Sequence, residues 1–303
     1  MASMAGVPKP PAARVVITHP EKVLFPEDGI TKGELAGYYE AVAPIMVPHM
    51  RARPVTMERY PQGLGEQSFW QKDVSKGFPE WLQRVEVPKK RGTVHHLLVP
   101  DTRSLLWLAN QNSITPHVWT SRAPNLHQPD ICVFDLDPGE DQPAILRSAA
   151  LALRDLLLEL GLTSWVKTSG SKGFHIVVSL DGKADFETVA PFAHSVGALL
   201  VKRDPDHLTQ EFSKADRGGR IFVDTARNGY SATFAAAYAV RAKPGAPVSA
   251  PCAWDEIARG EVGPTTFTLR RMPGRIAEVG DLWSEMPKQK RSLRRAVQRL
   301  RKL

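Results

Sequence analysis

The chain has 303 residues, a length that favours one large domain or two interlocked ones. Apolar residues make up 42% and charged residues 24% of the sequence, which excludes a wholly disordered chain, and two cysteines exclude a disulfide framework or a four-thiolate zinc site. The net charge is +8, but residues 288–303 carry eight Lys and Arg and no acid, so residues 1–287 are formally neutral.

The first third of the chain predicts a leader, a helix and a pair of strands. Residues 1–13 are rich in Ala and Pro without periodicity and are expected to be disordered. Apolar residues recur at helical spacing over 31–49, and Thr31 with Glu34 three positions on forms the pattern of a capping box. The segments 85–87 and 94–99 are typical of strands, and 103–112 is apolar enough for a helix.

The middle of the chain alternates strands and helices without a strict βαβ repeat. The pattern predicts strands at 131–137, 164–168, 174–180 and 220–224, helices at 143–160 and 185–202, and a connector over 242–252. This order favours a two-layer α/β (α+β) fold with mixed or antiparallel sheets rather than a doubly wound parallel sheet.

The basic segment 288–303 has apolar Leu293, Val297 and Leu300 at spacings of four and three, which predicts a short amphipathic helix. Basic runs often attract nucleic acid, but a solvated helical end has the same composition. The sequence leaves both interpretations open. No apolar run is as long as a membrane span and the first 20 residues lack a secretory apolar stretch, so we expect a cytoplasmic protein without membrane contact.

Two acids lie at the end of the strand 131–137. Asp135 and Asp137 are two residues apart, so their side chains share one face of the strand, while Phe134 and Leu136 face a core. Two neighbouring carboxylates that lose solvent repel each other, and divalent cations relieve that repulsion. Ordinary acids on a solvated edge strand would show the same pattern.

Asp224 ends another apolar strand, Ile221-Phe222-Val223-Asp224. If that strand pairs beside the first, three carboxylates converge and would hold two Mg²⁺ or Mn²⁺ ions. An Asp that merely starts a turn at a strand end is the alternative.

Several further residues have side chains suited to phosphates or bases. The loop 168–173 (Thr-Ser-Gly-Ser-Lys-Gly) combines glycines, hydroxyls and Lys172, although its spacing is not that of a Walker A loop and a plain hairpin would also fit. Arg227 and Arg241 are suited to a triphosphate, and His117 to a phosphate or sugar. Phe69, in Phe-Trp-Gln-Lys, is typical of a base-stacking platform or of core packing.

The ordered set of motifs is more specific than any single one. It comprises Glu21-Lys22-Val23-Leu24-Phe25-Pro26, Thr31-Lys32, Arg53-Pro54, Phe69-Trp70-Gln71-Lys72, Pro116-His117, Phe134-Asp135-Leu136-Asp137-Pro138-Gly139, Thr168-Ser169-Gly170-Ser171-Lys172-Gly173-Phe174-His175 and Phe222-Val223-Asp224. This set closely resembles the polymerase domain of bacterial ATP-dependent DNA ligase D, in the archaeo-eukaryotic primase superfamily. The resemblance implies a primase-like catalytic domain over residues 14–287, with 288–303 as a basic tail.

The resemblance also implies roles for individual residues. In the family, the residues that match Asp135, Asp137 and Asp224 coordinate two divalent ions, Mn²⁺ or Mg²⁺. Those that match Ser169, Lys172 and His117 contact the nucleotide, and those that match Arg227 and Arg241 grip its triphosphate. Phe69 would pack under the incoming base, and Lys22 and Lys32 would bind the 5′-phosphate on the downstream side of a gap or break.

The implied activity is that of a nucleotidyltransferase that extends DNA 3′ ends and fills short gaps from nucleoside triphosphates, with ribonucleotides preferred. The implied setting is non-homologous end joining as a monomer beside Ku and an ATP-dependent DNA ligase. The chain lacks a nucleotidyl-lysine motif of the Lys-x-Asp-Gly type, so an excised domain or a stand-alone relative in gap or excision repair is expected. The alternatives are a non-catalytic DNA-end-binding module that recruits ligase or Ku, and two-metal phosphodiester hydrolysis.

Overall fold

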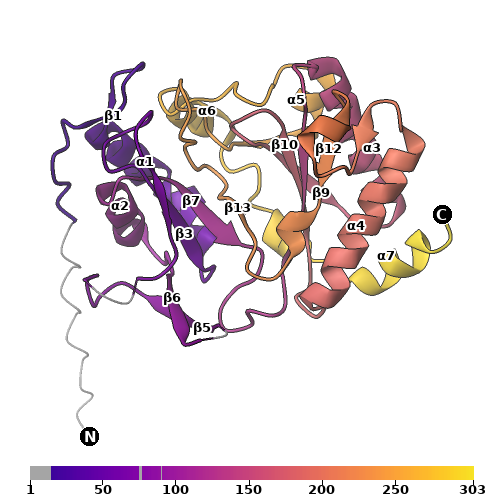
Figure 1. The fold of residues 1–303 in the computed structure, drawn as a ribbon, viewed down its shortest axis with the longest axis horizontal. Helices are drawn as coiled ribbons and strands as arrows, with labels where there is room; N and C mark the ends of the chain where they lie inside the picture. Colours follow the sequence, from indigo (N-terminus) through magenta and orange to yellow (C-terminus); the bar gives the residue numbers. More distant parts are fainter. Residues whose placement is uncertain (1–14, 75–76, 90) are drawn as a thin grey trace, which may run out of the picture.

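The computed structural model describes residues 15–74, 77–89 and 91–303, so the predicted leader over 1–13 lies outside the described residues. Two sheets divide the described chain between them, as Figure 1 shows, with the earlier residues on the left and the later ones on the right. The strands and helices mix as expected, and the sheets are predominantly antiparallel.

The right-hand sheet is made by the second half of the chain. Its strands are ordered β11-β12-β8-β10-β9-β14. Their bounds are Leu208–Thr209, Ile221–Asp224, Ile131–Asp137, Phe174–Ser179, Ser164–Thr168 and Pro251–Cys252. All pairs are antiparallel except β11 with β12. We call this the acidic sheet, because β8 and β12 carry the three aspartates.

Helices α3 (Pro143–Glu159) and α4 (Phe186–Arg203) cover one face of the acidic sheet. Leu146, Leu153 and Leu157 of α3 are buried, as the helical spacing predicts. On β8 the alternating Phe134 and Leu136 are fully buried, which leaves the aspartates on the opposite face. That face is therefore free of covering helices and looks toward the other sheet.

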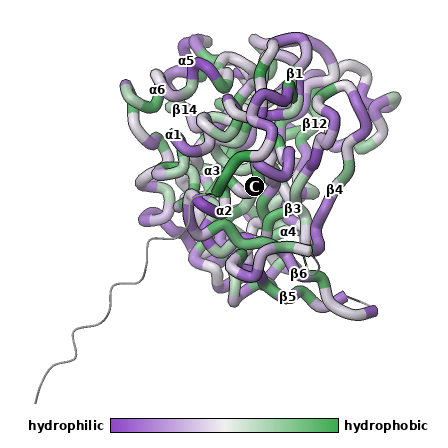
Figure 2. Tube along the Cα trace, turned by 90° about the vertical axis from the view of Figure 1, so that its left-hand side faces the viewer, coloured by the Kyte–Doolittle hydropathy of each residue, from purple (hydrophilic) through white to green (hydrophobic). Residues whose placement is uncertain are grey.

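The left-hand sheet is ordered β13-β7-β3-β6-β5, and β4 also pairs with β3, over Met57 to Arg59, beyond the point where β6 pairs at Val55. The bounds are Thr233–Ala235, Ser113–Trp119, Val55–Arg59, Thr93–Leu97, Arg84–Pro88 and, for β4, Phe69–Gln71. The β5–β6 hairpin projects from the lower edge of the molecule in both Figure 1 and Figure 2.

Helices α1 (Lys32–Met50) and α2 (Thr102–Asn110) pack against each other beside this second sheet. Thr31 caps α1, and the predicted capping box with Glu34 is present. Ahead of α1, β1 (Val23–Phe25) and β2 (Ile30–Thr31) form a small hairpin.

One continuous hydrophobic core runs through both halves of the molecule. Figure 2 shows hydrophobic stretches along the inner strands and helices and hydrophilic ones mostly on the outer loops. Two buried tyrosines of α1 fix that helix on its neighbours, since the Tyr39 hydroxyl donates to Ile114 O of β7 at 2.6 Å and the Tyr38 hydroxyl donates to Tyr238 O at 2.7 Å. A buried hydroxyl needs such a partner, so these two bonds favour one position of α1.

The C-terminal part forms α5 (Trp254–Arg259), α6 (Met272–Val279) and α7 (Leu293–Leu300). Short 3-10 turns cover Lys214–Arg217, Ala226–Asn228 and Met286–Lys288. The helix expected in the basic segment is therefore present as α7. Among the described residues, no helix is both long and apolar enough to cross a membrane.

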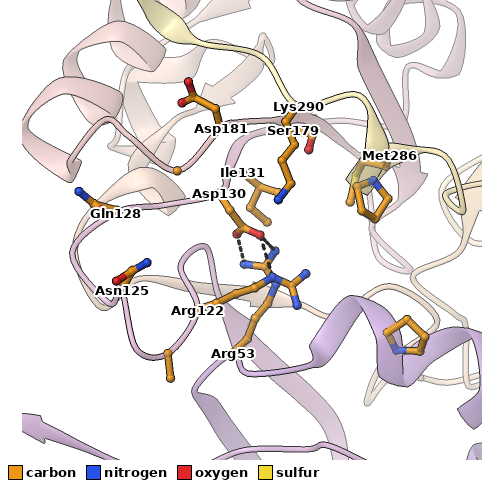
Figure 3. A pocket seen from close by; sticks show the side chains of 14 residues that line it. Arg53, Arg122, Asn125, Gln128, Asp130, Ile131, Ser179, Asp181, Met286 and Lys290 are labelled. Atoms are coloured by element: carbon orange, nitrogen blue, oxygen red, sulfur yellow. Dashed lines mark hydrogen bonds and ion pairs between the residues drawn. The ribbon is translucent and has the colours of Figure 1, made fainter.

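A cavity of about 330 Å³ lies where the end of α1, the β7–β8 connection and the segment before α7 meet (Figure 3). The Asp130 carboxylate accepts from Arg53 and Arg122 there, with Arg53 Nη1 2.6 Å from Oδ1 and Arg122 Nε 2.7 Å from Oδ2. Arg53 also donates to His49 O and Trp119 O, so these charges join elements rather than face a ligand.

Most predicted elements are confirmed within one or two residues. The expected helix over 103–112 instead ends at Asn110, because Asn112 adopts a left-handed backbone with φ of 55°. The expected strand over 94–99 ends at Leu97. The predicted connector over 242–252 contains the short β14, which pairs with β9 and closes the edge of the acidic sheet.

Candidate active site

Cross-strand register assembles one row of polar side chains on the free face of the acidic sheet. Lys167 on β9 lies opposite His175 on β10, His175 opposite Asp135 on β8, and Asp135 opposite Asp224 on β12. We call these four residues the polar row. Because directly opposed residues share a face, the third predicted carboxylate lies beside the first. Asp137, two residues beyond Asp135, is on the same face.

Short contacts link the members of the row. Lys167 Nζ lies 2.7 Å from His175 Nδ1 and donates to Ser249 Oγ. His175 Nε2 faces Asp135 Oδ1 at 3.4 Å. The row therefore fixes Asp135 from one side through a buried histidine, which in turn is oriented by a buried lysine.

Two arginines neutralise the aspartates. Arg227 lies 3.4 Å from Asp224 Oδ2 and 3.8 Å from Asp135 Oδ2. Arg217 lies 3.3 Å from Asp137 Oδ2, and its guanidinium is held over the Phe222 ring at 4.0 Å. Arg227 was expected to contact a triphosphate and instead bridges two of the acids in this structure.

Burial shifts the protonation equilibria of the row. It lowers the pKa of His175 to about 4, with a further contribution from Lys167, and lowers the pKa of Lys167 well below its usual value. Burial also raises the pKa of Asp224, and the neighbouring Asp135 and Asp137 add to this shift. For Asp135 the effect of burial is outweighed by His175 and Arg227, so its pKa stays below the ordinary value.

The donor atoms at this site suit hard divalent cations. Three carboxylates on one sheet face provide oxygen ligands, and their mutual repulsion favours binding of positive charge. In the present conformation, with the arginines in contact, no group of three or more His, Cys, Asp or Glu side chains among residues 15–74, 77–89 and 91–303 is arranged to hold a metal ion. The carboxylate oxygens are suitable ligands for divalent ions. In this structure Arg217 and Arg227 supply the positive charge beside them instead.

The loop 169–173 packs directly on the end of β8. A Cβ on Gly173 would lie 1.6 Å from Leu136 O, between the two aspartates, so only glycine permits this approach. Ser169, predicted to contact the nucleotide, is buried, and its Oγ accepts from Ser171 N and Gly173 N at 3.1 and 3.0 Å. In this structure Ser169 shapes the loop, and Lys172 at the loop tip is exposed.

Arg241 connects the loop to the second sheet. Its Nη1 donates to Ser169 O at 2.8 Å, and burial lowers its pKa while Asp135 and Glu58 act in the opposite direction. A Cβ on Gly170 would lie 2.5 Å from Arg241 Cγ. The predicted Arg241 is therefore seated under the loop, close enough to Asp135 for a charge interaction.

His117 on β7 lies on the second sheet and faces this charged region. Burial lowers its pKa to about 4, and Arg241 and Arg227 also disfavour its charged form. Its Nε2 is 3.7 Å from Glu58 Oε2 and forms no hydrogen bond among the described residues. A neutral buried imidazole with an unpartnered nitrogen is suited to accept or donate one hydrogen bond to a ligand.

A polar pocket of about 400 Å³ opens beside Asp137. Its basic lining residues are Lys172, Lys214, Arg217 and Lys243. Four cations around one opening outnumber its two carboxylates, Asp137 and Glu140, and suit a polyanionic ligand such as a triphosphate. Lys214, Arg217 and Lys243 are residues that sequence reasoning missed, since each lies in a turn without a recognisable motif.

The two aromatics of β4 face opposite ways. Phe69, predicted to pack under a base, is 43% exposed and lies 5.3 Å from the Arg59 guanidinium. Trp70 points to the other face, where its ring contacts that of His117 at 4.8 Å. Trp70 is thus the aromatic beside the charged region, and the role of Phe69 stays a prediction.

The predicted lysine pair lies apart from the aspartates, at the start of α1. Lys32 is 3% exposed and donates to Thr18 Oγ1 at 3.2 Å, and Lys22 donates to Pro61 O. Burial lowers the pKa of Lys32, and the nearby Lys22 and Arg59 lower it further. The structure brings the two lysines together and adds Arg59, which sequence reasoning missed because it lies inside a strand.

Known proteins with similar sequences belong to one DNA-repair family. A family model described as the LigD primase-polymerase domain matches residues 31–283. The multifunctional non-homologous end joining protein LigD of Mycolicibacterium smegmatis is 36% identical over 272 residues, which cover 89% of this chain and 35% of that protein. The multifunctional non-homologous end joining protein LigD of Pseudomonas aeruginosa is 32% identical over 299 residues, which cover 97% of this chain and 35% of that protein. The chain thus spans about a third of these curated relatives.

Among solved structures, the polymerase domain of Mycobacterium tuberculosis ligase D in complex with DNA matches with a TM-score of 0.86 and 33% identity, over 92% of this chain and 99% of that one. The chain belongs to the LigD primase-polymerase family, and it has the archaeo-eukaryotic primase fold that the sequence predicts.

Proposed function

We propose that this chain is a nucleotidyltransferase that adds nucleotides to DNA 3′ ends and fills short gaps during the repair of broken DNA. Asp135, Asp137 and Asp224 would hold two divalent ions, Mn²⁺ or Mg²⁺. When bound, these ions lower the pKa of the attacking hydroxyl and stabilise the leaving pyrophosphate. Binding requires Arg217 and Arg227 to release the aspartates, since both now contact them.

The chain's own residues bind and orient the nucleotide. Lys172, Lys214 and Lys243 line the pocket beside Asp137 and would neutralise the β- and γ-phosphates. Arg241, which lies under the loop and donates to Ser169 O, would help to neutralise the same phosphates from the interior of the protein. Trp70 and His117, whose rings lie 4.8 Å apart on the second sheet, would place the base and the sugar.

Within the row, His175 and Lys167 are positioning residues. His175 is neutral near pH 7 because burial lowers its pKa to about 4, and Lys167 orients its ring by contact with Nδ1. Nε2 is thereby directed at Asp135, which fixes the carboxylate without adding a positive charge that would compete with bound ions.

Lys22, Lys32 and Arg59 form a separate cationic group that would hold a 5′-phosphate on the downstream side of a gap. Lys32 is nearly buried, so its charge is expensive to keep without an anion close by. A phosphate at this position would stabilise the charged form. Recognition of both ends of a gap is what a gap-filling enzyme needs.

The observation that carries the proposal is the register that places Asp224 directly opposite Asp135, because three carboxylates on one face have no structural role in a mere end-binding module. The test is extension of a gapped DNA substrate with Mn²⁺, comparing ribonucleotides with deoxyribonucleotides and a 5′-phosphate with a 5′-hydroxyl. We expect extension that is stronger with ribonucleotides and with the phosphate. A purified protein that binds the gap but never extends it would contradict the proposal and favour the end-binding module.

The partners proposed for this activity are Ku and an ATP-dependent DNA ligase, since the family's curated members are named for non-homologous end joining. Hydrolysis of the DNA is the competing chemistry for paired ions. Incubation of the gapped substrate without nucleotide separates the two, because shortened products would indicate hydrolysis.

A further inference from the structure

The basic segment at the C-terminal end is not loose but seated on the body of the protein. Arg291 N donates to Ser179 O at 3.0 Å, and Asp181 N donates to Arg291 O at 3.1 Å, which adds the segment to the end of β10. Lys290, just before it, lines the cavity in Figure 3. These contacts fix the point from which α7 starts.

The apolar side of α7 packs against α4. Leu293 is 3% and Ala296 1% exposed, and Val297 and Leu300 are partly buried against the main core. Arg299 adds a polar anchor, since its Nη1 lies 3.4 Å from Glu159 O at the end of α3. The helix is therefore held in one orientation by its apolar side.

That orientation turns the basic side of α7 outward. Arg294 and Arg295 of α7, and Arg301 and Lys302 just after its last residue, are all exposed. At 100° per residue Arg294 and Arg295 point away from the buried Leu293 and Ala296, whereas Arg301 lies beside the grooves that flank the helix. Within the part of the chain that the structure describes, none of these four side chains forms an ion pair. Asp181 and Glu187 line the grooves beside α7 without pairing with it.

We propose that the exposed cations on and just after α7, the basic face formed by Arg294, Arg295, Arg301 and Lys302, are a second nucleic-acid contact that binds the phosphate backbone without regard to sequence. The inference rests on the nucleic-acid substrate proposed above. Four exposed cations without ion pairs, in a basic segment that follows a formally neutral body over residues 1–287, match a regular polyanion. They hold no fixed hydrogen-bond geometry that would select a base.

The position of the basic face makes this contact additional to the candidate active site. Helix α4 lies between α7 and the acidic sheet (Figure 1). The aspartates alternate with the buried Phe134 and Leu136 of β8, so they lie on the sheet face away from α4. The segment also begins beyond the part of the chain that matches the family model, which ends at residue 283. The basic face would therefore lengthen the time that the protein stays bound to DNA, without taking part in nucleotide addition.

The test measures DNA affinity against salt concentration for wild-type protein and two variants. In R294Q/R295Q/R301Q/K302Q the basic face is neutral, whereas R294K/R295K/R301K keeps every charge and changes only side-chain shape. Fluorescence anisotropy with a gapped duplex and with closed circular plasmid as competitor gives the slope of log Kd against log salt. Thermal melting and single-nucleotide addition at saturating DNA serve as checks on fold and active site.

We expect the slope of the glutamine variant to be smaller in magnitude by up to about 3.6, since each of the four lost phosphate contacts contributes about 0.9. The lysine variant should bind as wild type does. The largest proportional loss should occur on closed plasmid, which has neither a gap nor an end for the active site. Both variants should melt and add nucleotides as wild type does.

An unchanged slope in the glutamine variant would overturn the proposal. So would a glutamine variant that binds DNA normally but no longer binds poly-glutamate, because the face would then fit an acidic protein. Failure of the proposed function is distinguishable, since an Asp135→Asn protein that cannot extend a primer should keep the wild-type salt slope.

Discussion

The cations closest to the aspartates differ in burial from those of the basic face of α7. Lys167 and Arg217 are buried and Arg241 is partly buried, each with a named contact, whereas the pocket residues Lys172, Lys214 and Lys243 are exposed. On α7 the cations are exposed and unpaired among the described residues. A buried and fixed charge positions one ligand group, whereas an exposed and mobile one binds any phosphate and is screened by salt.

The number of charged residues in a segment does not by itself locate a catalytic site. The basic segment dominates the net charge, yet the chemistry is placed where the chain is formally neutral. Burial makes each active-site charge depend on its neighbours, as the lowered pKa values of His175 and His117, each to about 4, illustrate. We therefore expect substitutions to have large specific effects there and graded effects on α7.

The largest effect is expected when the aspartates are removed. In Asp135→Ala/Asp137→Ala, two ion ligands are lost and nucleotide addition should become undetectable, while DNA affinity and its salt slope stay unchanged. Primer extension with Mn²⁺ and anisotropy measure the two properties on one preparation. Asp135→Asn/Asp137→Asn, which keeps side-chain size, controls for folding by thermal melting. Normal extension by the alanine variant would refute the assignment.

A buried ion pair outside both regions should affect stability alone. Asp130→Asn leaves Arg53, which is 2% exposed, without its carboxylate, and we expect a loss of about 3 kcal/mol in the free energy of unfolding. Urea denaturation at pH 7 measures it. Nucleotide addition by the folded variant should remain, because the pair lies at the cavity in Figure 3 rather than at the aspartates.

The same pair predicts how stability depends on pH. Burial acts to raise the pKa of Asp130, but Arg53 and Arg122 outweigh it and hold this pKa below its ordinary value. The contribution is therefore fully present above the pKa of the unfolded chain and is lost as pH falls through the folded one. Between pH 5 and 3, wild type should lose more stability than Asp130→Asn does, and equal losses would contradict this account.

The close approach of the loop 169–173 to β8 gives the next effect. In Gly173→Ala the new methyl group would lie 1.6 Å from Leu136 O, so the loop must shift, at a cost of about 2 kcal/mol. Nucleotide affinity should fall with it, because Lys172 is carried by the same loop. Gly37→Ala in α1, with no heavy atom within 4 Å, is the matched control and should be neutral or stabilising. Equal behaviour of the two variants would count against a tightly seated loop.

The smallest of these effects concerns the 5′-phosphate. Lys32→Gln should reduce the preference for a 5′-phosphate over a 5′-hydroxyl about tenfold, a loss of about 1.4 kcal/mol, because one charge-assisted contact is removed. Lys202→Gln, on an exposed part of α4, changes the net charge equally and should leave the preference intact. An equal loss in both variants would assign the effect to overall charge.

The sequence predicts much of this fold because local patterns are strong. The capping box at Thr31 and the strand 131–137 are both found as expected. Strand order and register depend on pairing between distant segments, which local patterns do not determine. The sequence therefore predicted that Asp224 approaches Asp135 only if the two strands pair, as β12 and β8 do.

The residues that sequence reasoning missed share a physical cause. Lys167 lies in an otherwise ordinary strand, and its role depends on the neighbour that register provides, His175. Arg217 and Arg59 likewise acquire partners only through tertiary contacts. For Phe69 and Trp70 the sequence indicated an aromatic pair but not which ring faces His117, because that depends on how β4 pairs with β3.

The central claim is that Asp135, Asp137 and Asp224 act together as one cation site. Electron paramagnetic resonance of Mn²⁺, titrated with nucleotide present, tests it most directly in wild type and in the three single Asp→Asn variants, with Asp181→Asn as a control away from the site. We expect each of the three to weaken Mn²⁺ binding at least about tenfold and the control to bind as wild type does. Wild-type Mn²⁺ binding by Asp224→Asn would contradict the account, since the third carboxylate would then be no part of the site.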